Sequence, residues 1–467
     1  MLSIRRNDFI YSLAILAIGV MAGAVVATVD YLAVIGAAIV GALIVIVMRA
    51  RSTRSDATST TVDVAIYVLL AIYLLPMLTL GRVYALVGHK PLYLADVLVM
   101  CIAVLALPHA FRGRMSAFSL LSLAVGLLML HSVYVGYAQH YQGALRGLVM
   151  VIYPLAAIPI AAWLASRSDL ERDIASFARH VLPFVPIGLA VVIVLHQSVI
   201  AASYGLYLGV VGAFAVVPGV PRRRLLLLAC FIGLTMLISF SAKRGPALAI
   251  ALGILAAWAA SGSFRSHRSM ATLALASLLS ISVMALAASI GFVAPTRLPV
   301  VGNLIARVVD SRSNSSTEAA NNVTLRTAMW AYALETTAIR GPFLGVGAFH
   351  PIEVSLYGNN IADDPESGVH NSFLGYAFYA GFPAGGLLIG LFVVGLWQTW
   401  RIRRTTIYAP ALFGALVAVV VTALTNVALE TTYIAGPSWL ILAAAIGLAA
   451  RYSNGPHSSS TVTAGLV

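Results

Sequence analysis

The chain has 467 residues, of which 60% are hydrophobic and only 10% are charged, and its mean hydropathy is +0.95. A soluble globular protein carries about 25% charged residues, so this composition excludes a water-soluble fold and favours a membrane protein. The net charge of +13 is typical of arginine-rich cytoplasmic loops in such proteins, and we expect no nucleic-acid partner. Cys101 and Cys230 lie inside apolar runs, which predicts core residues and neither a disulfide nor a metal pair.

Apolar runs of about 20 residues, the length of a membrane-spanning helix, follow one another along the chain. The candidate spans are Phe9–Ala27, Tyr31–Met48, Val62–Leu80, Tyr93–Ala110, Ala117–Tyr137, Gly147–Ala165, Phe177–His196, Ser203–Val220, Leu225–Ser241, Pro246–Ser261, Met270–Val293, Ser372–Trp397, Ile407–Val427 and Ile434–Ala450. Because several of them are short, we predict an all-α polytopic membrane protein with about 12 to 14 transmembrane helices.

Arginines fall in every second loop between these spans, as in the segments 222–224 and 401–404. Cytoplasmic loops carry an excess of basic residues, so both termini are predicted to lie inside, and the long polar segment 294–371 outside. The expected organisation is transmembrane helices over residues 1–293, the outer loop over 294–371, further spans over 372–450 and a disordered cytoplasmic tail over 451–467.

The outer loop contains one predicted amphipathic helix, Thr317–Arg340. Leu325, Met329 and Tyr332 recur at helical spacing in it. Arg340-Gly341-Pro342 predicts its end, since a cation, glycine and proline in that order are typical of a helix terminus.

Basic residues and a histidine stand at the outer starts of three predicted spans: Arg146 before one, Lys243 and Arg244 before another, and His370 before a third. A helix start presents unpaired N–H groups and a partial positive charge, so a nearby arginine is unfavourable unless an anion binds there. We therefore expect this face to bind a strongly negative group at membrane depth, such as a lipid-linked pyrophosphate. The alternative for Arg146 and Arg244 is that they are snorkelling anchors.

The same surroundings disfavour a charged imidazole at His370, so we expect it to be neutral near pH 7, as a general base must be. The simpler reading is a polar residue at the membrane interface. Arg326 has a corresponding simpler reading, as a solvated residue of its helix.

Several short motifs occur in order from residue 241 to 386: Ser241 to Gly245, Arg326 with Trp330, the turn Pro342 to Gly347, His370-Asn371-Ser372-Phe373-Leu374, and Gly381-Phe382-Pro383. Their order and spacing resemble the O-antigen ligase and polymerase superfamily of bacterial inner-membrane glycosyltransferases. Lys243 departs from the small residue expected beside Arg244.

The resemblance implies an enzyme that transfers a glycan from undecaprenyl pyrophosphate to an acceptor hydroxyl at the periplasmic face of the inner membrane. The ligase is the member most similar in length and loop layout, and its acceptor is lipid A-core. Such enzymes need no metal, nucleotide or other cofactor. Carried over by position, His370 would be the general base, and Arg146, Arg244 and Arg326 would bind the pyrophosphate, with Lys243 sharing that role.

This chemistry suits the residue types. Arginines stabilise charge on a pyrophosphate leaving group, and direct attack by the acceptor hydroxyl predicts inversion at the anomeric carbon, since a double displacement needs a carboxylate nucleophile. Asp363, Asp364 and Glu366 are close to His370 in sequence, and one of them is a candidate to orient the imidazole.

Two alternatives stay open at this stage. An O-antigen polymerase or a protein O-oligosaccharyltransferase of the same superfamily differs only in its acceptor. A polysaccharide or lipid transporter belongs to a different class, but transporters place ionisable groups near the bilayer midplane, and here the notable charges lie at one interface.

Overall fold

The computed structural model describes residues 61–89, 92–111, 116–194, 200–241, 244–262, 317–352, 355–356, 359–360 and 368–454. The predicted spans Phe9–Ala27, Tyr31–Met48 and Met270–Val293 lie outside these residues. So do Lys243, the three acidic residues next to His370 and the tail after Asn454.

The described residues form helices with two minimal antiparallel strand pairs. The helices before the long loop are α3 (Thr61–Leu80), α4 (Arg82–Ala85), α5 (Leu94–Ala110), α6 (Ala117–Ala138), α7 (Leu148–Ser166), α8 (Leu170–His180), α9 (Val185–Val194), α10 (Ile200–Val216), α11 (Arg223–Ser241) and α12 (Arg244–Ser261), with 3-10 turns η2 (Ala144–Gly147) and η3 (Leu182–Phe184). Those after it are α15 (Thr317–Arg340), α16 (Ser372–Ala380), α17 (Phe382–Arg401), α18 (Tyr408–Thr425) and α19 (Thr432–Asn454). Strand β1 (Gly88–His89) pairs with β2 (Leu92–Tyr93), and β3 (Ser355–Leu356) pairs with β4 (Asn359–Asn360).

The chain is an all-α polytopic membrane protein, as its composition predicts. Among the described residues, six helical segments are long and apolar enough to cross a membrane: Ala117–Ala138, Ala144–Ser166, Leu170–Ile193, Phe382–Arg401, Tyr408–Thr425 and Thr432–Ser453. Four shorter apolar helices accompany them: Val62–Leu78, Leu94–Ala110, Ser203–Val216 and Gly245–Ser261.

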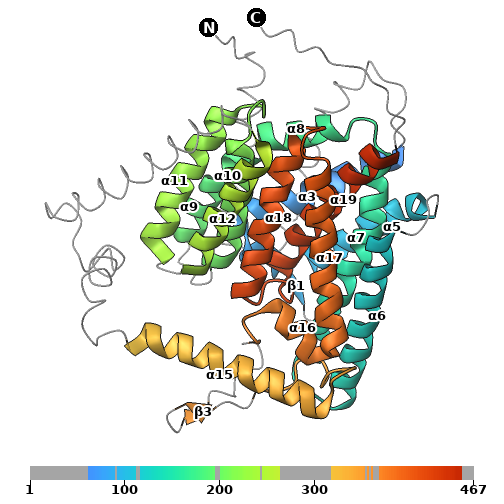
Figure 1. Cartoon of the computed structure of the whole chain (residues 1–467), viewed down its shortest axis with the longest axis vertical. Coiled ribbons are helices and arrows are strands. Elements are labelled where there is room, and N and C mark those ends of the chain that lie inside the picture. The colour runs from blue at the N-terminus through green and yellow to red at the C-terminus, as the bar shows by residue number, and fades with distance from the viewer. Residues whose placement is uncertain are drawn as a thin grey trace, which may run out of the picture.

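Two groups of helices form the bundle. Helices α10, α11, α12 and α18 pack together on one side, while α5, α6, α7 and α19 pack on the other, and α17 contacts α6, α18 and α19 (Figure 1). Helices α12 and α18 approach closely because each has a glycine at the crossing: a Cβ on Gly414 would lie 2.4 Å from the Gly253 carbonyl oxygen. Close backbone approach at small residues is how membrane helices gain packing energy without a hydrophobic driving force.

Two predicted spans are interrupted, which corrects the sequence analysis. Phe177–His196 is not one helix, because α8 ends at His180 and the 3-10 turn η3, which contains Pro183, precedes α9. Ser372–Trp397 is divided at Gly381, whose φ of 88° lies in the left-handed region and ends α16 after nine residues.

Helix α15 has the bounds predicted from its periodicity, Thr317 to Arg340. It lies across one end of the bundle, beside α16 (Figure 1). Met329 and Ala333 are buried on its inner side, while Ile339 is 74% exposed. Helix α15 therefore packs against the rest of the structure through the face that carries Met329 and Ala333.

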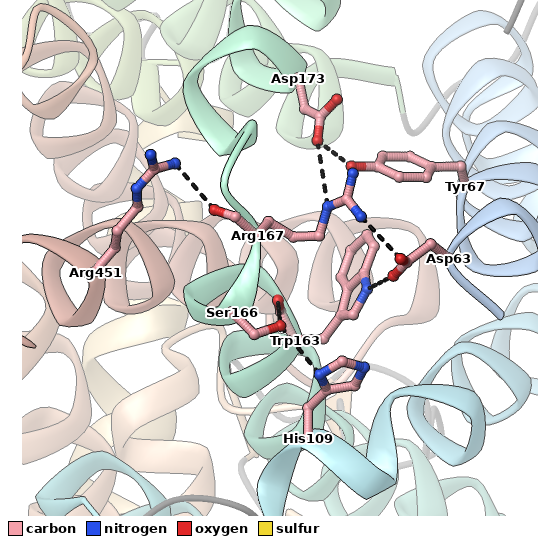
Figure 2. Close-up of polar contacts among 8 residues, drawn as sticks. All are labelled: Asp63, Tyr67, His109, Trp163, Ser166, Arg167, Asp173 and Arg451. Carbon is pink, nitrogen blue, oxygen red and sulfur yellow. Dashed lines mark hydrogen bonds and ion pairs between the residues drawn. The ribbon is translucent and has the colours of Figure 1, made fainter. Parts of the chain in front are cut away.

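A buried ion pair ties several helices together at the opposite end of the bundle. Arg167 Nη1 lies 2.9 Å from Asp63 Oδ2, and Asp63 Oδ1 accepts a hydrogen bond from the Trp163 indole at 2.8 Å (Figure 2). Asp173, at the start of α8, faces the same guanidinium at 4.0 Å and accepts a hydrogen bond from Tyr67. The Arg451 guanidinium reaches the Arg167 carbonyl oxygen from α19, so this cluster joins α3, α7, α8 and α19.

Arg167→Ala is expected to destabilise the protein, because it leaves the Asp63 carboxylate buried without its cation. Loss of one partner of a buried pair costs about 3–5 kcal/mol, which predicts a fall of several degrees in the thermal unfolding midpoint in detergent. Arg404→Ala removes the same charge from an exposed position and is the control. Equal midpoints for the two variants would contradict this role of the ion pair.

Candidate functional site

His370 lies in a left-handed turn directly before α16. Its φ is 55°, a conformation that is uncommon for residues other than glycine and is maintained only when the surroundings impose it. The next residue, Asn371, is the N-cap of α16, and its side chain accepts a hydrogen bond from the Leu374 N–H at 3.2 Å. The cap fixes where the helix begins and thereby holds His370 immediately outside it, half-buried.

The two residues before His370 are anchored on both sides. Val369 is fully buried, and its carbonyl oxygen accepts a hydrogen bond from the Trp330 indole of α15 at 2.8 Å. Gly368 packs so closely on Val427 that a Cβ would lie 2.7 Å from Val427 Cγ1. The pairing of Trp330 with the histidine motif, which are 40 positions apart in sequence, therefore has a direct structural basis.

Val427 belongs to the connection between α18 and α19, residues 426–431, which we call the α18–α19 linker. Ser372 Oγ accepts hydrogen bonds from the N–H groups of Ala428 at 2.9 Å and Leu429 at 3.0 Å, and it donates to Glu430 Oε2 at 2.5 Å. The Tyr376 hydroxyl, one turn further along α16, donates to the Leu429 carbonyl oxygen at 3.4 Å. The linker is thus fastened to the first turns of the helix that follows His370.

Arg326 of α15 reaches the residue that precedes the linker. Its Nη1 donates to the Thr425 carbonyl oxygen at 3.0 Å, and a cation is favourable at the carboxyl end of α18 because carbonyl groups there lack helical partners. Burial lowers the pKa of the Arg326 guanidinium below its usual value, but an arginine remains cationic in proteins. Arg326 is therefore a half-buried cation beside the linker and not a solvated surface residue.

The start of α12 meets the same linker from another side. Helix α12 begins at Arg244, and a Cβ on Gly245 would lie 2.9 Å from Thr425 Oγ1 and 3.6 Å from Asn426 Nδ2. Only glycine allows this approach, which explains its place beside Arg244. The backbone of Arg244 is thereby next to the residue that accepts the Arg326 hydrogen bond.

The turn from Pro342 to Gly347 packs against the break between α16 and α17. The Val346 and Gly347 N–H groups donate to the carbonyl oxygens of Phe378 and Tyr379, both at 3.1 Å. Gly345 has φ 71°, and a Cβ there would lie 2.2 Å from the Tyr379 carbonyl oxygen. Two motifs from the sequence therefore form one unit.

Arg146 lies beside this unit. It is in η2, directly before α7, and its guanidinium carbon is 5.8 Å from the centroid of the Phe349 ring. Phe349 in turn stacks on Tyr379 with centroids 5.9 Å apart. The aromatic contact positions the cation near the end of α16, because guanidinium groups bind favourably over aromatic faces.

Arg82 joins Arg146 near the start of α19, which the sequence analysis did not foresee. Its guanidinium carbon is 5.9 Å from the Tyr433 ring centroid, and both arginines interact electrostatically with the Tyr433 hydroxyl. Tyr433 follows the α18–α19 linker by two positions. Arg82 stands in a loop that the charge pattern places outside, but no motif distinguishes it from an ordinary loop arginine.

Glu430 is the second residue that sequence reasoning missed. Its side chain is only 7% exposed, and burial raises the pKa of its carboxyl to about 7, because hydrogen bonds from Ser372 and the linker backbone offset only part of the desolvation. It is the single acidic residue after Glu366. A lone carboxylate between two apolar helices is expensive to bury, and that is the signal that would have found it.

Contacts with the α18–α19 linker and its two flanking residues therefore unite Arg326, the backbone at Arg244 and the turn that holds His370. Arg146 is linked to them through Phe349 and Tyr379 of α16. The described residues contain no group of three or more His, Cys, Asp or Glu side chains placed to hold a metal ion.

The carboxyl of Glu430 makes stability depend on pH. Between its ordinary pKa of 4.5 and the folded value of about 7, the folded chain keeps a proton that the unfolded chain releases. The free energy of unfolding therefore falls as pH rises through this window. Glu430→Gln cannot ionise and does not lose this stability. As pH rises from about 5 to about 8, the thermal unfolding midpoint of the variant should therefore increase relative to that of the wild-type protein. If the difference between the two midpoints stays constant with pH, the carboxyl of Glu430 is not a buried group that titrates in this range. The control is Glu171→Gln, at a half-buried carboxylate that accepts a hydrogen bond from Tyr452.

Comparison with known proteins relates one part of the chain to a family. None of the curated proteins matches the chain. Residues 226–389 match the family described as O-antigen ligase, a segment that contains the start of α12, Arg326, the Pro342–Gly347 turn and His370. Over these residues the chain is similar to the O-antigen ligase family.

Proposed function

We propose that the protein is an O-antigen ligase that transfers a glycan from undecaprenyl pyrophosphate to a sugar hydroxyl of lipid A-core, at the periplasmic face of the bacterial inner membrane. The observation that carries this proposal is the meeting of three family-matched segments, those of Arg244, Arg326 and His370, at the α18–α19 linker. A single reaction centre built from these segments requires them to pack together although they are distant in sequence.

The arginines suit a diphosphate. A guanidinium has five N–H donors in a rigid fork, so the hydrogen bond from Arg326 to Thr425 leaves the group able to contact an anion as well. Arg146 and Arg82 add positive charge on the α19 side of the linker. In the half-buried setting of these residues, charge–charge interactions with a pyrophosphate are stronger than in bulk water.

In the proposed reaction, the acceptor oxygen forms a bond to the anomeric carbon while the bond from that carbon to the pyrophosphate oxygen breaks. The electron pair of the broken bond leaves on the pyrophosphate, where the arginines stabilise it. His370 accepts the proton of the acceptor hydroxyl. A single displacement of this kind inverts the anomeric configuration, and it requires neither a metal nor a cofactor.

A specific feature argues for an enzyme over a transporter. Arg326, the His370 turn and Glu430 lie around the connection between α18 and α19, which is fastened by hydrogen bonds. A transporter is expected to have its ionisable groups near the middle of its helices. The acceptor separates the ligase from a polymerase or a protein O-oligosaccharyltransferase, and supplying lipid A-core, a second glycan carrier or a protein to the purified enzyme decides among them.

His370→Ala is expected to abolish glycan transfer while preserving insertion, the thermal midpoint and donor binding. A positioned base contributes about 10²–10⁴-fold, so the turnover number should fall by that factor in an assay with purified protein, lipid-linked donor and lipid A-core. His131→Ala changes an exposed histidine of α6 and should keep normal activity. Normal turnover by His370→Ala would remove the base assignment.

Arg244→Ala is expected to weaken binding of the lipid-linked donor but not binding of the acceptor. Loss of a charged hydrogen bond costs about 1.5–3 kcal/mol, so the KM for the lipid-linked glycan should rise by about tenfold or more with little change for lipid A-core. Arg224→Ala, at the start of α11 and exposed, is the matched control. If the acceptor KM rises instead, Arg244 handles the acceptor.

A further inference from the structure

Glu430 has a buried carboxylate in which one oxygen accepts a hydrogen bond and the other packs against the α16 backbone. Oε2 accepts the Ser372 hydroxyl at 2.5 Å. Oε1 has no hydrogen-bond partner among the described residues, and it faces Gly375 so closely that a Cβ there would lie 2.4 Å away. The side chain is therefore fixed between the first and second turns of α16.

Simple stability does not account for this arrangement. A carboxylate at 7% exposure loses hydration, and its described compensation consists of hydrogen bonds from Ser372 and the linker backbone, with no cation among the groups that act on it. An apolar residue of similar volume would pack there at lower cost. A residue that weakens the fold locally is expected where function requires it.

Ser372 links the Glu430 carboxylate to the start of α16. Its hydroxyl is saturated: it accepts from the Ala428 and Leu429 N–H groups and donates to Glu430. Without an acceptor at Glu430, the hydroxyl proton is left with the Asn426 carbonyl oxygen at 3.3 Å, a longer hydrogen bond than the one to Glu430, and the junction loosens. Ser372 is the first residue of α16 and is only two positions after His370, whose left-handed turn requires support from its neighbours.

We propose that Glu430 is a positioning residue for His370: through Ser372 its side chain holds the first turn of α16, and with it the turn at His370, in a fixed place against the α18–α19 linker. The catalytic meaning of this link rests on the proposed function, in which His370 is the base. The link itself is a statement about geometry and holds whatever the acceptor is. It assigns the orienting role that the sequence suggested for Asp363, Asp364 or Glu366 to a carboxylate 60 positions after His370.

The test combines chemical labelling with kinetics on the full-length protein in nanodiscs. The rate of carbethoxylation by diethyl pyrocarbonate, read at His370 by mass spectrometry, reports the surroundings of the imidazole without any turnover. The variants are Glu430→Ala, which removes the acceptor; Glu430→Gln, which keeps an oxygen for Ser372; and Ser372→Ala, which breaks the same hydrogen bond from the other side. Glu171→Gln is the control at a carboxylate outside the site.

We expect Glu430→Ala and Ser372→Ala to change the labelling rate at His370 by about threefold or more, with labelling at His131 unchanged, and Glu430→Gln to stay close to the wild-type rate. In the transfer assay, kcat of Glu430→Ala should fall by about 10- to 100-fold, as when a residue that orients a metal-binding histidine is lost, with the donor KM nearly constant. Glu430→Gln should recover most of kcat.

Unchanged labelling of His370 in Glu430→Ala and Ser372→Ala would overturn the proposal, as would a Gln variant as impaired as the Ala variant. If Glu430→Ala does not fold, Ser372→Ala alone decides. If the wild-type protein transfers glycan to no acceptor, the proposed function fails, and the labelling rates still decide whether Glu430 positions His370.

Discussion

The hydrogen-bonded junction between Ser372 and the α18–α19 linker is the constraint on which the rest of the site depends. One hydroxyl binds two backbone N–H groups and one carboxylate, and this fastens the start of α16 to the connection between two membrane helices. The turn at His370, Arg326 and the start of α12 all contact that connection or Thr425 directly before it. A change in the linker would therefore move several candidate site residues together.

The arginines at the two ends of the bundle have different kinds of partner. Away from the site, Arg167 is neutralised by Asp63 and Asp173, which suits a joint between helices. Near the linker, Arg326 donates to a carbonyl oxygen, and Arg82 and Arg146 lie over aromatic rings; these contacts orient the guanidinium groups. In the proposed reaction, cations oriented in this way suit an anionic leaving group.

Much of the fold followed from the sequence where a periodic pattern coincided with a clear end signal. Helix α15 has its predicted bounds because its apolar spacing ends at Arg340-Gly341-Pro342. The interruptions at Gly381 and at Val181 were missed because apolar residues continue on both sides, so hydropathy does not register a change in φ. The motifs identified His370 and Arg326, but not their common partner: the linker lies about 60 positions beyond His370, and only the packing of α16 against it reveals the roles of Ser372 and Glu430.

The most direct measurement of the central claim is a structure of the protein in nanodiscs with undecaprenyl pyrophosphate bound, determined by cryo-electron microscopy. The account predicts diphosphate density beside the α18–α19 linker, in contact with Arg326 and at least one of Arg146 and Arg244, with the imidazole of His370 facing the side where the acceptor enters. Diphosphate density at the Arg167 end of the bundle, or an imidazole directed into lipid, would contradict it.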